Sequence, residues 1–427
     1  MALPHLELVS TELRHLSVVA HERARDRTLG LALVDLVDPV NPDGLRQNAT
    51  IRRLDPGGGR VSDLDILLAE LRRRFAASHG GWVPRMGKNR VLHGVHGLEH
   101  VSGGGAGDPR PERGDGGPSR AAAGRSTPAP ERRPSGAGHG GHQDGHQGGH
   151  RGGDDARVGV LDTRIYPHER LVGRFIAPGD ALIDPSAAPA VFSPWAGHAT
   201  FVAGLIMDRA PDAELEVRQV LGDAHATASA WDVARMMVSF TECEIDVLNL
   251  SFGCYTADGR PPLVLARAVE LLAPDIVMVA AAGNHGNVTP SADDPILTPR
   301  TPIWPAAFDD VVAVGAHDGS GRAAPFTPKD APWISLLAPG VDIRGDYLVG
   351  RVRVRPDGRS GDTEGAYQRF DGTAVWSGTS FAAAHVSGVI AARTMHGRRT
   401  AHAARDELLR LAAGHSTEGI MPYGCCG

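Results

Sequence analysis

Three short segments of the sequence each carry one side chain that can move a proton or attack a carbonyl group. Asp162 ends the apolar run 158–161, His198 follows a glycine at the start of a second apolar run, and Ser380 opens a third. A serine hydroxyl attacks an amide at neutral pH only when a neighbouring base takes its proton. A histidine can be that base, and a buried carboxylate can hold its tautomer and stabilise the imidazolium. The three residues therefore predict acyl-transfer chemistry with Ser380 as the nucleophile.

The elements around these residues are expected to bring them to one edge of a sheet. The run 158–161 is typical of a buried parallel strand, so the Asp162 carboxylate should lie at the carboxyl end of that strand, where α/β proteins form their sites. The apolar runs after His198 and Ser380 predict two helices. Backbone N–H groups in the first turn of the second helix can help to hold an oxyanion.

A fourth segment adds a candidate donor for the same oxyanion. The apolar strand predicted over residues 275–282 leads into Asn284, within a glycine-rich turn. Its side-chain amide can point an N–H group at the negative charge that develops during attack. Each of the four residues has a plain structural reading, as a helix cap or a turn residue. Their occurrence together, in one order, favours the chemical reading.

In this order the four segments resemble those of the subtilisin-like serine proteases (subtilases), over about residues 156–415. Segments 247–253, 303–315 and 337–340 also resemble structural parts of that family. The resemblance implies an α/β fold with a parallel sheet and helices on both faces. It implies a serine endopeptidase that is either general or dedicated to maturing one peptide. The catalytic residues that it implies are Asp162, His198 and Ser380 as the triad and Asn284 as the oxyanion donor.

Three positions depart from the family pattern. Arg164 and Ala199 stand where glycine is usual, and Ala384 stands where proline is common. None of them removes a catalytic atom, although Arg164 is expected to charge or narrow the edge of the site. Two alternatives therefore stay open: a catalytically silent subtilase fold that serves as a binding module, and a serine hydrolase of another kind, such as an esterase.

The resemblance also implies where a peptide substrate binds. An extended peptide is expected to pair with the edge 222–227 through main-chain hydrogen bonds, with its P1 side chain between residues 251–253 and 281–283. The implied substrate-binding residues are Gly222, His225, Ser251, Phe252, Gly253, Ala282 and Gly283. His285 stands at the expected pocket mouth, where some members carry glutamate, so no strong preference for a basic P1 residue is expected. No aspartate cluster has calcium-ligand spacing, so neither a metal nor a cofactor is expected.

Strands and helices are predicted to alternate within residues 156–415. Apolar runs indicate strands over 214–220, 245–251 and 275–282, with helices over 230–240 and 262–272 between them. This alternation indicates a parallel sheet covered by helices. The polar, glycine-rich stretch 345–376 alternates like an exposed hairpin and is expected to frame the entrance to the site.

The rest of the chain is predicted to form a small domain, a linker and a tail. Residues 1–101 indicate an α+β domain with a strand over 28–37 and a helix capped by Ser62. Residues 102–155 are of low complexity and predict a disordered linker, and residues 416–427 form a C-terminal tail. Because a flexible tether keeps the N-terminal domain near the cleft, we expect this domain to restrain the catalytic domain. The turn-rich segment 81–90 is expected to cover the cleft, to contact a partner, or to be an ordinary loop with a buried Trp82.

Composition limits the classes of partner and the cellular compartment. The chain has 427 residues, a net charge of −6 and 41% hydrophobic residues, so it has ample material for a core and no overall attraction to nucleic acid or anionic membranes. No signal peptide or apolar span of about 18 residues is apparent, which predicts a cytoplasmic protein. Cys243 and Cys254 are expected to be buried or partly buried thiols, and Cys425 and Cys426 to be inert.

Overall fold

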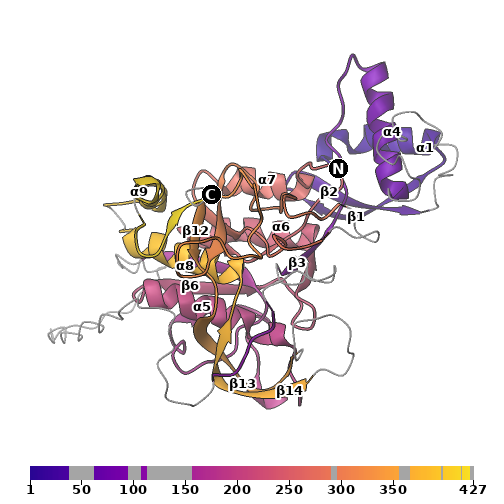
Figure 1. Cartoon of the computed structure of the whole chain (residues 1–427). Coiled ribbons are helices and arrows are strands. Elements are labelled where there is room, and N and C mark those ends of the chain that lie inside the picture. Colours follow the sequence, from indigo (N-terminus) through magenta and orange to yellow (C-terminus); the bar gives the residue numbers. More distant parts are fainter. Residues whose placement is uncertain are drawn as a thin grey trace, which may run out of the picture.

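The computed structural model describes residues 1–37, 62–94, 107–112, 156–289, 296–354, 366–395, 398–414 and 416–423. Most of the predicted linker, together with Cys425 and Cys426, lies outside these residues. Figure 1 shows a main body built around a central sheet, with the N-terminal helices α1 and α4 projecting from its upper right. No helix in the described part of the chain is both long enough and apolar enough to cross a membrane.

The main body is built on an eight-stranded sheet in the order β15-β12-β11-β10-β8-β4-β6-β5, in which only the β12–β15 pair is antiparallel. Its strands are β4 (Arg157–Asp162), β5 (Phe175–Ile176), β6 (Glu214–Gln219), β8 (Val247–Leu250), β10 (Val277–Ala281), β11 (Val311–His317), β12 (Leu336–Pro339) and β15 (Met421–Pro422). The central strands are continuous apolar runs because both faces of a parallel sheet are covered. Strand β4, which ends at Asp162, lies between β8 and β6.

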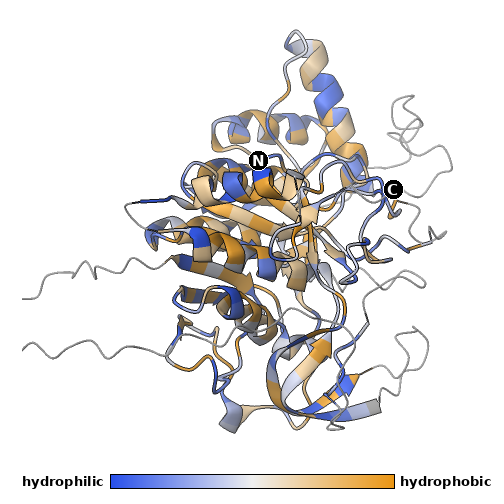
Figure 2. Ribbon diagram, turned by 60° about the vertical axis from the view of Figure 1, so that its left-hand side comes forward, coloured by the Kyte–Doolittle hydropathy of each residue, from blue (hydrophilic) through white to orange (hydrophobic). Residues whose placement is uncertain are grey.

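Helices cover both faces of this sheet, as predicted. Helices α5 (His198–Arg209), α8 (Thr379–Arg393) and α9 (Ala401–Gly414) share one core with Val277 and Val279 of β10. Helices α6 (Ala230–Ser239) and α7 (Leu263–Leu272) share the other core with Met278 and Ala280 of the same strand. Figure 2 shows the apolar sheet between helices whose outer faces are hydrophilic. Short 3-10 helices η3 (Pro185–Ala187), η4 (Pro194–Gly197) and η5 (Phe240–Glu242) complete the connections.

The N-terminal region combines helices with an antiparallel strand pair. Its elements are η1 (Leu3–His5), α1 (Leu6–His15), β1 (Val19–Asp26), β2 (Leu31–Val37) and α4 (Asp63–Ser78). Ser62 caps α4 by accepting a hydrogen bond from the Asp65 backbone N–H, as predicted. Val9 and Leu13 of α1 pack against Leu67, Leu71 and Phe75 of α4 in a small core of their own.

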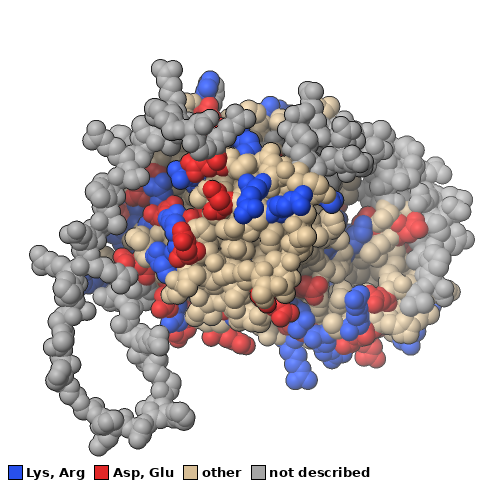
Figure 3. Space-filling view, turned by 90° about the horizontal axis from the view of Figure 1, so that it is seen from below, with Lys and Arg blue, Asp and Glu red and all other residues tan. Residues whose placement is uncertain are grey.

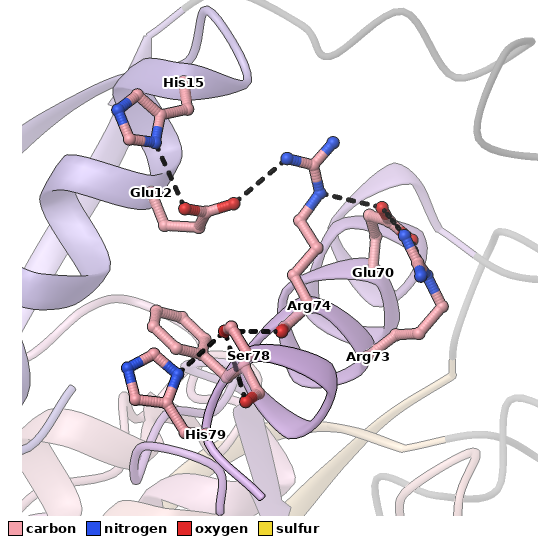
Figure 4. A network of polar contacts seen from close by, with 8 residues as sticks. Glu12, His15, Glu70, Arg73, Arg74, Ser78 and His79 are labelled. Carbon is pink, nitrogen blue, oxygen red and sulfur yellow. Dashed lines mark hydrogen bonds and ion pairs between the residues drawn. The ribbon is translucent and has the colours of Figure 1, made fainter. Parts of the chain in front are cut away.

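Ion pairs join the two helices of this region beside that core (Figure 4). Arg74 of α4 bonds Glu70 Oε1 at 2.8 Å and Glu12 Oε1 of α1 at 3.0 Å. Arg73 approaches both Glu70 oxygens at 2.7 Å. The hydrogen bond from Arg73 lowers the pKa of Glu70, against the opposing effect of burial. The Glu70 carboxylate is therefore held ionised at neutral pH.

A long hairpin, β13 (Ile343–Val354) with β14 (Ala366–Trp376), lies at the lower end of the molecule in Figure 1. It is not simply an exposed hairpin, because Tyr347 and Phe370 are fully buried in a cluster with Phe201 and Phe381 of α5 and α8. The face seen from below in Figure 3 has acidic and basic side chains interspersed around a largely uncharged centre.

Residues 107–112 lie within the stretch expected to be a disordered linker, yet they contact this hairpin. Arg110 exchanges backbone hydrogen bonds with Val375 at 2.9 and 2.8 Å, and the Trp376 Nε1–H donates to the Gly107 carbonyl at 2.9 Å. The paired backbone explains the difference, since β14 offers an open edge that low complexity does not reveal. Part of the predicted linker is therefore bound to the main body.

A second, three-stranded sheet connects the N-terminal region to the main body. Strand β3 (Val91–Gly94) lies between β7 (Thr227–Ser229) and β9 (Phe252–Gly253) and is antiparallel to both. The segment just before β3 contacts the start of α6, where Asn89 Oδ1 accepts a hydrogen bond from the Trp231 backbone N–H at 2.9 Å. Residues 82–90 form neither helix nor strand, but Trp82 is 43% exposed, so the expectation that it is buried is wrong.

Candidate active site

The Asp162 carboxylate and the His198 imidazole form a buried pair at the carboxyl end of β4. His198 Nδ1 lies 2.8 and 2.9 Å from the two Asp162 oxygens, and neither side chain is exposed. The Thr163 backbone N–H donates to Asp162 Oδ1 at 2.7 Å and fixes the carboxylate. His198 is the first residue of α5, so its ring projects from the helix start toward the sheet edge. With Nδ1 directed at a carboxylate, Nε2 is the ring atom that can take a proton.

Three aromatic rings enclose the His198 imidazole. Trp195 and Phe381 lie 5.8 Å from it between ring centres, and Trp376 stands edge-on at 5.5 Å. Trp195 belongs to η4, just before α5, while Trp376 ends β14 and Phe381 follows Ser380 on α8. The rings exclude water from the imidazole, which strengthens its electrostatic contact with Asp162.

Ser380 lies in the first turn of α8, directly behind the sheet edge. Its backbone carbonyl accepts a hydrogen bond from Ser251 Oγ at 3.4 Å, which ties it to the end of β8. Asn249 of β8 supports this contact by bonding both Ser251 and Ser387 at 3.0 Å. Among the described residues the Ser380 hydroxyl has no hydrogen-bond partner, although it is fully buried. Contacts between a nucleophile and its base are often loose before substrate binds.

Asn284 lies next to Ser380 with its side chain oriented by Thr379. The Asn284 Oδ1 accepts from the Thr379 backbone N–H at 3.0 Å and from Thr379 Oγ1 at 3.1 Å. The Gly283 backbone in turn donates to Thr379 Oγ1 at 3.2 Å. Because Oδ1 is committed, the amide N–H group is the part of Asn284 left to donate, and it has no partner within the described part of the chain. A buried donor of this kind suits an oxyanion.

The residues expected to bind substrate lie in two groups. Ser251, Phe252 and Gly253 run along β9 beside β3, while Gly222 and the exposed His225 form a turn closed by the Ala226 N–H donating to the Gly222 carbonyl at 2.7 Å. Strand β3 pairs with residues 226–229, which overlap the end of the edge 222–227 expected to bind substrate. Ala282 and Gly283 follow β10 and are buried near Thr379.

His285 does not lie at a pocket mouth, which corrects the expectation. It is 2% exposed, and its Nε2 lies 2.9 Å from the Thr301 carbonyl. Burial lowers the pKa of His285 to about 4, so the ring is neutral at pH 7. Gly283 has φ +104°, and a Cβ there would lie 2.7 Å from the ring. His285 thus packs behind the turn that carries Asn284.

Arg164 and the two described cysteines have structural surroundings. The Arg164 backbone and side chain both bond Asp223, so the guanidinium charge at this edge of the site is paired. Cys254 is buried and Cys243 partly buried, both as free thiols, as predicted. Burial raises the pKa of the Cys254 thiol to about 12, which makes it a poor nucleophile. In the described residues no group of three His, Cys, Asp or Glu side chains could hold a metal ion.

Sequence reasoning missed the aromatic rings around His198 and the role of Thr379. Trp195 precedes His198 by three residues and Trp376 precedes Ser380 by four, so both could have been found as aromatic residues just before the helices that begin at these positions. No feature of the sequence indicated that β3 would pair between β7 and β9.

The sequence profile of the subtilase family matches residues 153–420. The match covers more than half of the chain, and the protein therefore belongs to the subtilase family.

Curated relatives agree with this assignment over the same region. The chain is 28% identical over 253 residues to a thermophilic serine proteinase of Bacillus sp. (strain AK1), covering 56% of this chain and 52% of the relative. It is 26% identical to an intracellular serine protease of Paenibacillus polymyxa, covering 55% and 65%, and 30% identical to a thermostable alkaline protease of Halalkalibacterium halodurans, covering 55% and 56%. The chain thus spans between half and two thirds of the length of these relatives.

Two solved structures are similar at 25% sequence identity. They are the prenylagaramide maturation protease PagA, with a TM-score of 0.41 over 57% of this chain and 76% of that one, and the protease domain of PatA, with a TM-score of 0.44 over 60% and 86%.

Proposed function

We propose that the chain is a serine endopeptidase with Asp162, His198 and Ser380 as its triad and Asn284 as its oxyanion donor. The observation that carries the proposal is the buried Asp162–His198 pair at 2.8 Å, at the sheet edge where Ser380 and the free Asn284 amide also lie. In this assignment His198 Nε2 takes the Ser380 proton as Oγ attacks the scissile carbonyl, and later gives that proton to the leaving amine. Water then hydrolyses the acyl-enzyme by the same route.

The Asn284 amide and the N–H groups of the first α8 turn stabilise the tetrahedral oxyanion in this scheme. Thr379 holds the Asn284 carbonyl, so the donor is oriented before the charge develops and little reorganisation is needed. The enclosure by Trp195, Trp376 and Phe381 lowers the local dielectric, which strengthens these contacts.

The N-terminal region restrains this site by placing β3 in the cleft. The strand pairs with both edges expected to bind a peptide, and Leu92 of β3 is fully buried against the main body. A substrate cannot add a strand to these edges while β3 occupies them. The close fit of β3 favours the narrower role, in which the enzyme matures one peptide, over general digestion.

Labelling with a fluorophosphonate probe tests the catalytic assignment. The probe should modify Ser380 in the full-length protein, identified by mass spectrometry, and Ser380→Ala should abolish both the label and peptide hydrolysis with unchanged circular dichroism. Labelling accompanied by hydrolysis of simple esters but of no peptide would instead support the esterase. Absence of any label, even in a variant whose β3 is displaced, would support the silent binding module.

A further inference from the structure

Gly94, the last residue of β3, lies where the second sheet meets the triad. Its backbone N–H donates to the Ala226 carbonyl at 2.7 Å, and it is opposite Phe252 in the pairing with β9. Trp195 lies beside it and also stacks near the His198 ring. Gly94 therefore marks a position of the cleft immediately next to the catalytic base.

A side chain at this position would be crowded by its neighbours. A Cβ on Gly94 would lie 3.0 Å from the Ala226 Cβ and 3.1 Å from Trp195 Cζ3. Optimal carbon–carbon separations are about 3.5 to 4.0 Å, so a methyl group would fit only if both neighbours moved by a few tenths of an ångström. The restriction therefore comes from the walls of the cleft and not from the backbone of β3, whose φ at Gly94 is not positive.

Both walls are fixed by their own contacts. Ala226 is fully buried and has φ +48°, a left-handed conformation held by the hydrogen bond from its N–H to the Gly222 carbonyl. The Trp195 backbone bonds Thr163 and Ser193, and its ring contacts the rings of His198 and Trp376. A shift of either wall would disturb these contacts, which include those of Trp195 with the His198 ring.

We propose that the cleft selects glycine at this position of its peptide substrate, with Trp195 and Ala226 as the specificity-determining residues. The inference rests on the proposed peptidase function. A substrate bound in the register of β3 would place the residue after its glycine opposite Ser251, whose Oγ bonds the Ser380 carbonyl. The glycine thus stands one residue before the residue whose carbonyl Ser380 attacks. The substrate class is a peptide with glycine immediately before the residue at which it is cleaved.

Hydrogen exchange tests the subsite without relying on catalysis. In full-length Ser380→Ala protein, Gly94→Ala should accelerate exchange of the residue 91–94 amides at least about tenfold, the factor that corresponds to an overpacking cost of about 1.4 kcal/mol. Ala226→Gly removes one close contact and suits the positive φ, so the double variant should recover protection. Unchanged exchange in Gly94→Ala, or a double variant without recovery, would overturn the proposal.

Peptide kinetics test the same restriction on a substrate. The enzyme is the full-length Leu92→Asp variant, in which β3 should be displaced. The first substrate is a coumarin amide of Val-Leu-His-Gly-Val, the sequence of residues 91–95, and the second has alanine in place of the glycine. We expect kcat/KM at least about tenfold higher for the glycine peptide, and a smaller ratio when Ala226→Gly is added. Equal values for the two peptides would refute the subsite while leaving the peptidase intact. Hydrolysis of neither peptide, with exchange showing β3 displaced, would refute the proposed function, and the subsite would then be decided by the exchange result.

Discussion

Asn284 illustrates, at the scale of a single residue, how a buried polar side chain is oriented by the partners it already has. Its carbonyl accepts two hydrogen bonds from Thr379, so the amide cannot flip without losing both. A buried donor with no partner costs stability in the free protein. The donor is retained at that cost if a negative charge occupies its position during catalysis, which is the role that we propose.

We expect Asn284→Ala to lower kcat by about 10²-fold to 10³-fold with little change in KM, because an oxyanion donor acts mainly in the transition state. Thr379→Val is the matched variant: it keeps the backbone bond to Asn284, removes the side-chain bond, and also removes the acceptor of the Gly283 N–H. It should lower kcat by a smaller factor. Steady-state kinetics on one peptide decide the matter, and a change confined to KM would move Asn284 from catalysis to substrate binding.

Helix α8 shows, at the scale of an element, that the helix carrying the proposed nucleophile also carries a group sensitive to acid. It carries Ser380 in its first turn and the buried His385 farther along, and His385 Nε2 lies 3.0 Å from the Glu418 carbonyl. Burial, reinforced by Arg209, lowers the pKa of His385 to about 3. The unfolded chain, with a histidine pKa of about 6.5, therefore binds more protons than the folded chain between these two values.

Stability should consequently be complete above about pH 6.5 and should fall as the pH decreases toward 3. At pH 4.5 the contribution of His385 to this loss is about 2 to 3 kcal/mol. His385→Gln can still donate to the Glu418 carbonyl but does not titrate, so its unfolding free energy should depend less on pH. Urea unfolding at pH 7 and 4.5 in a Ser380→Ala background measures this difference. The same pH dependence in both proteins would show that another group causes the acid sensitivity.

The elements of the main body were predictable because apolar runs carry their own pattern. The runs at 214–220 and 275–282 became β6 and β10, and the predicted helices became α6 and α7 with bounds shifted by one residue. Pairing across long sequence distances was not predictable. Strand β3 is only four residues long, and its partners lie more than 130 residues later, so nothing local indicates that it is a strand.

The candidate catalytic residues were predictable from the sequence, but the side chains that surround them were not. Asp162, His198 and Ser380 each stand at the end of a recognisable element, so their positions follow from strand and helix boundaries. The enclosure of His198 instead depends on side chains from three elements that meet only in the folded chain. His285 was misplaced because sequence position in a turn does not determine whether a side chain faces the cleft or the core.

The whole molecule consists of a main body and an N-terminal region that meet through β3 and through Leu29 and Leu31, which share the core under α6 and α7. The N-terminal region has its own core between α1 and α4, and Leu92 belongs instead to the core under α6 and α7. A substitution at Leu92 should therefore displace the strand without unfolding either part. This separation allows restraint of the cleft to be tested in the intact chain.

We expect Leu92→Asp to raise kcat/KM for a short peptide at least about tenfold in the full-length protein, because a buried carboxylate without a partner costs more than β3 gains by pairing. Val91→Asp is the matched control, since Val91 is 56% exposed on the same strand and its side chain can stay in water. Its kcat/KM should remain close to that of the unmodified protein. Circular dichroism must first show that both variants are folded. Equal activity of the two variants would mean that β3 does not restrain the cleft, and would leave the N-terminal region a role in folding or partner binding.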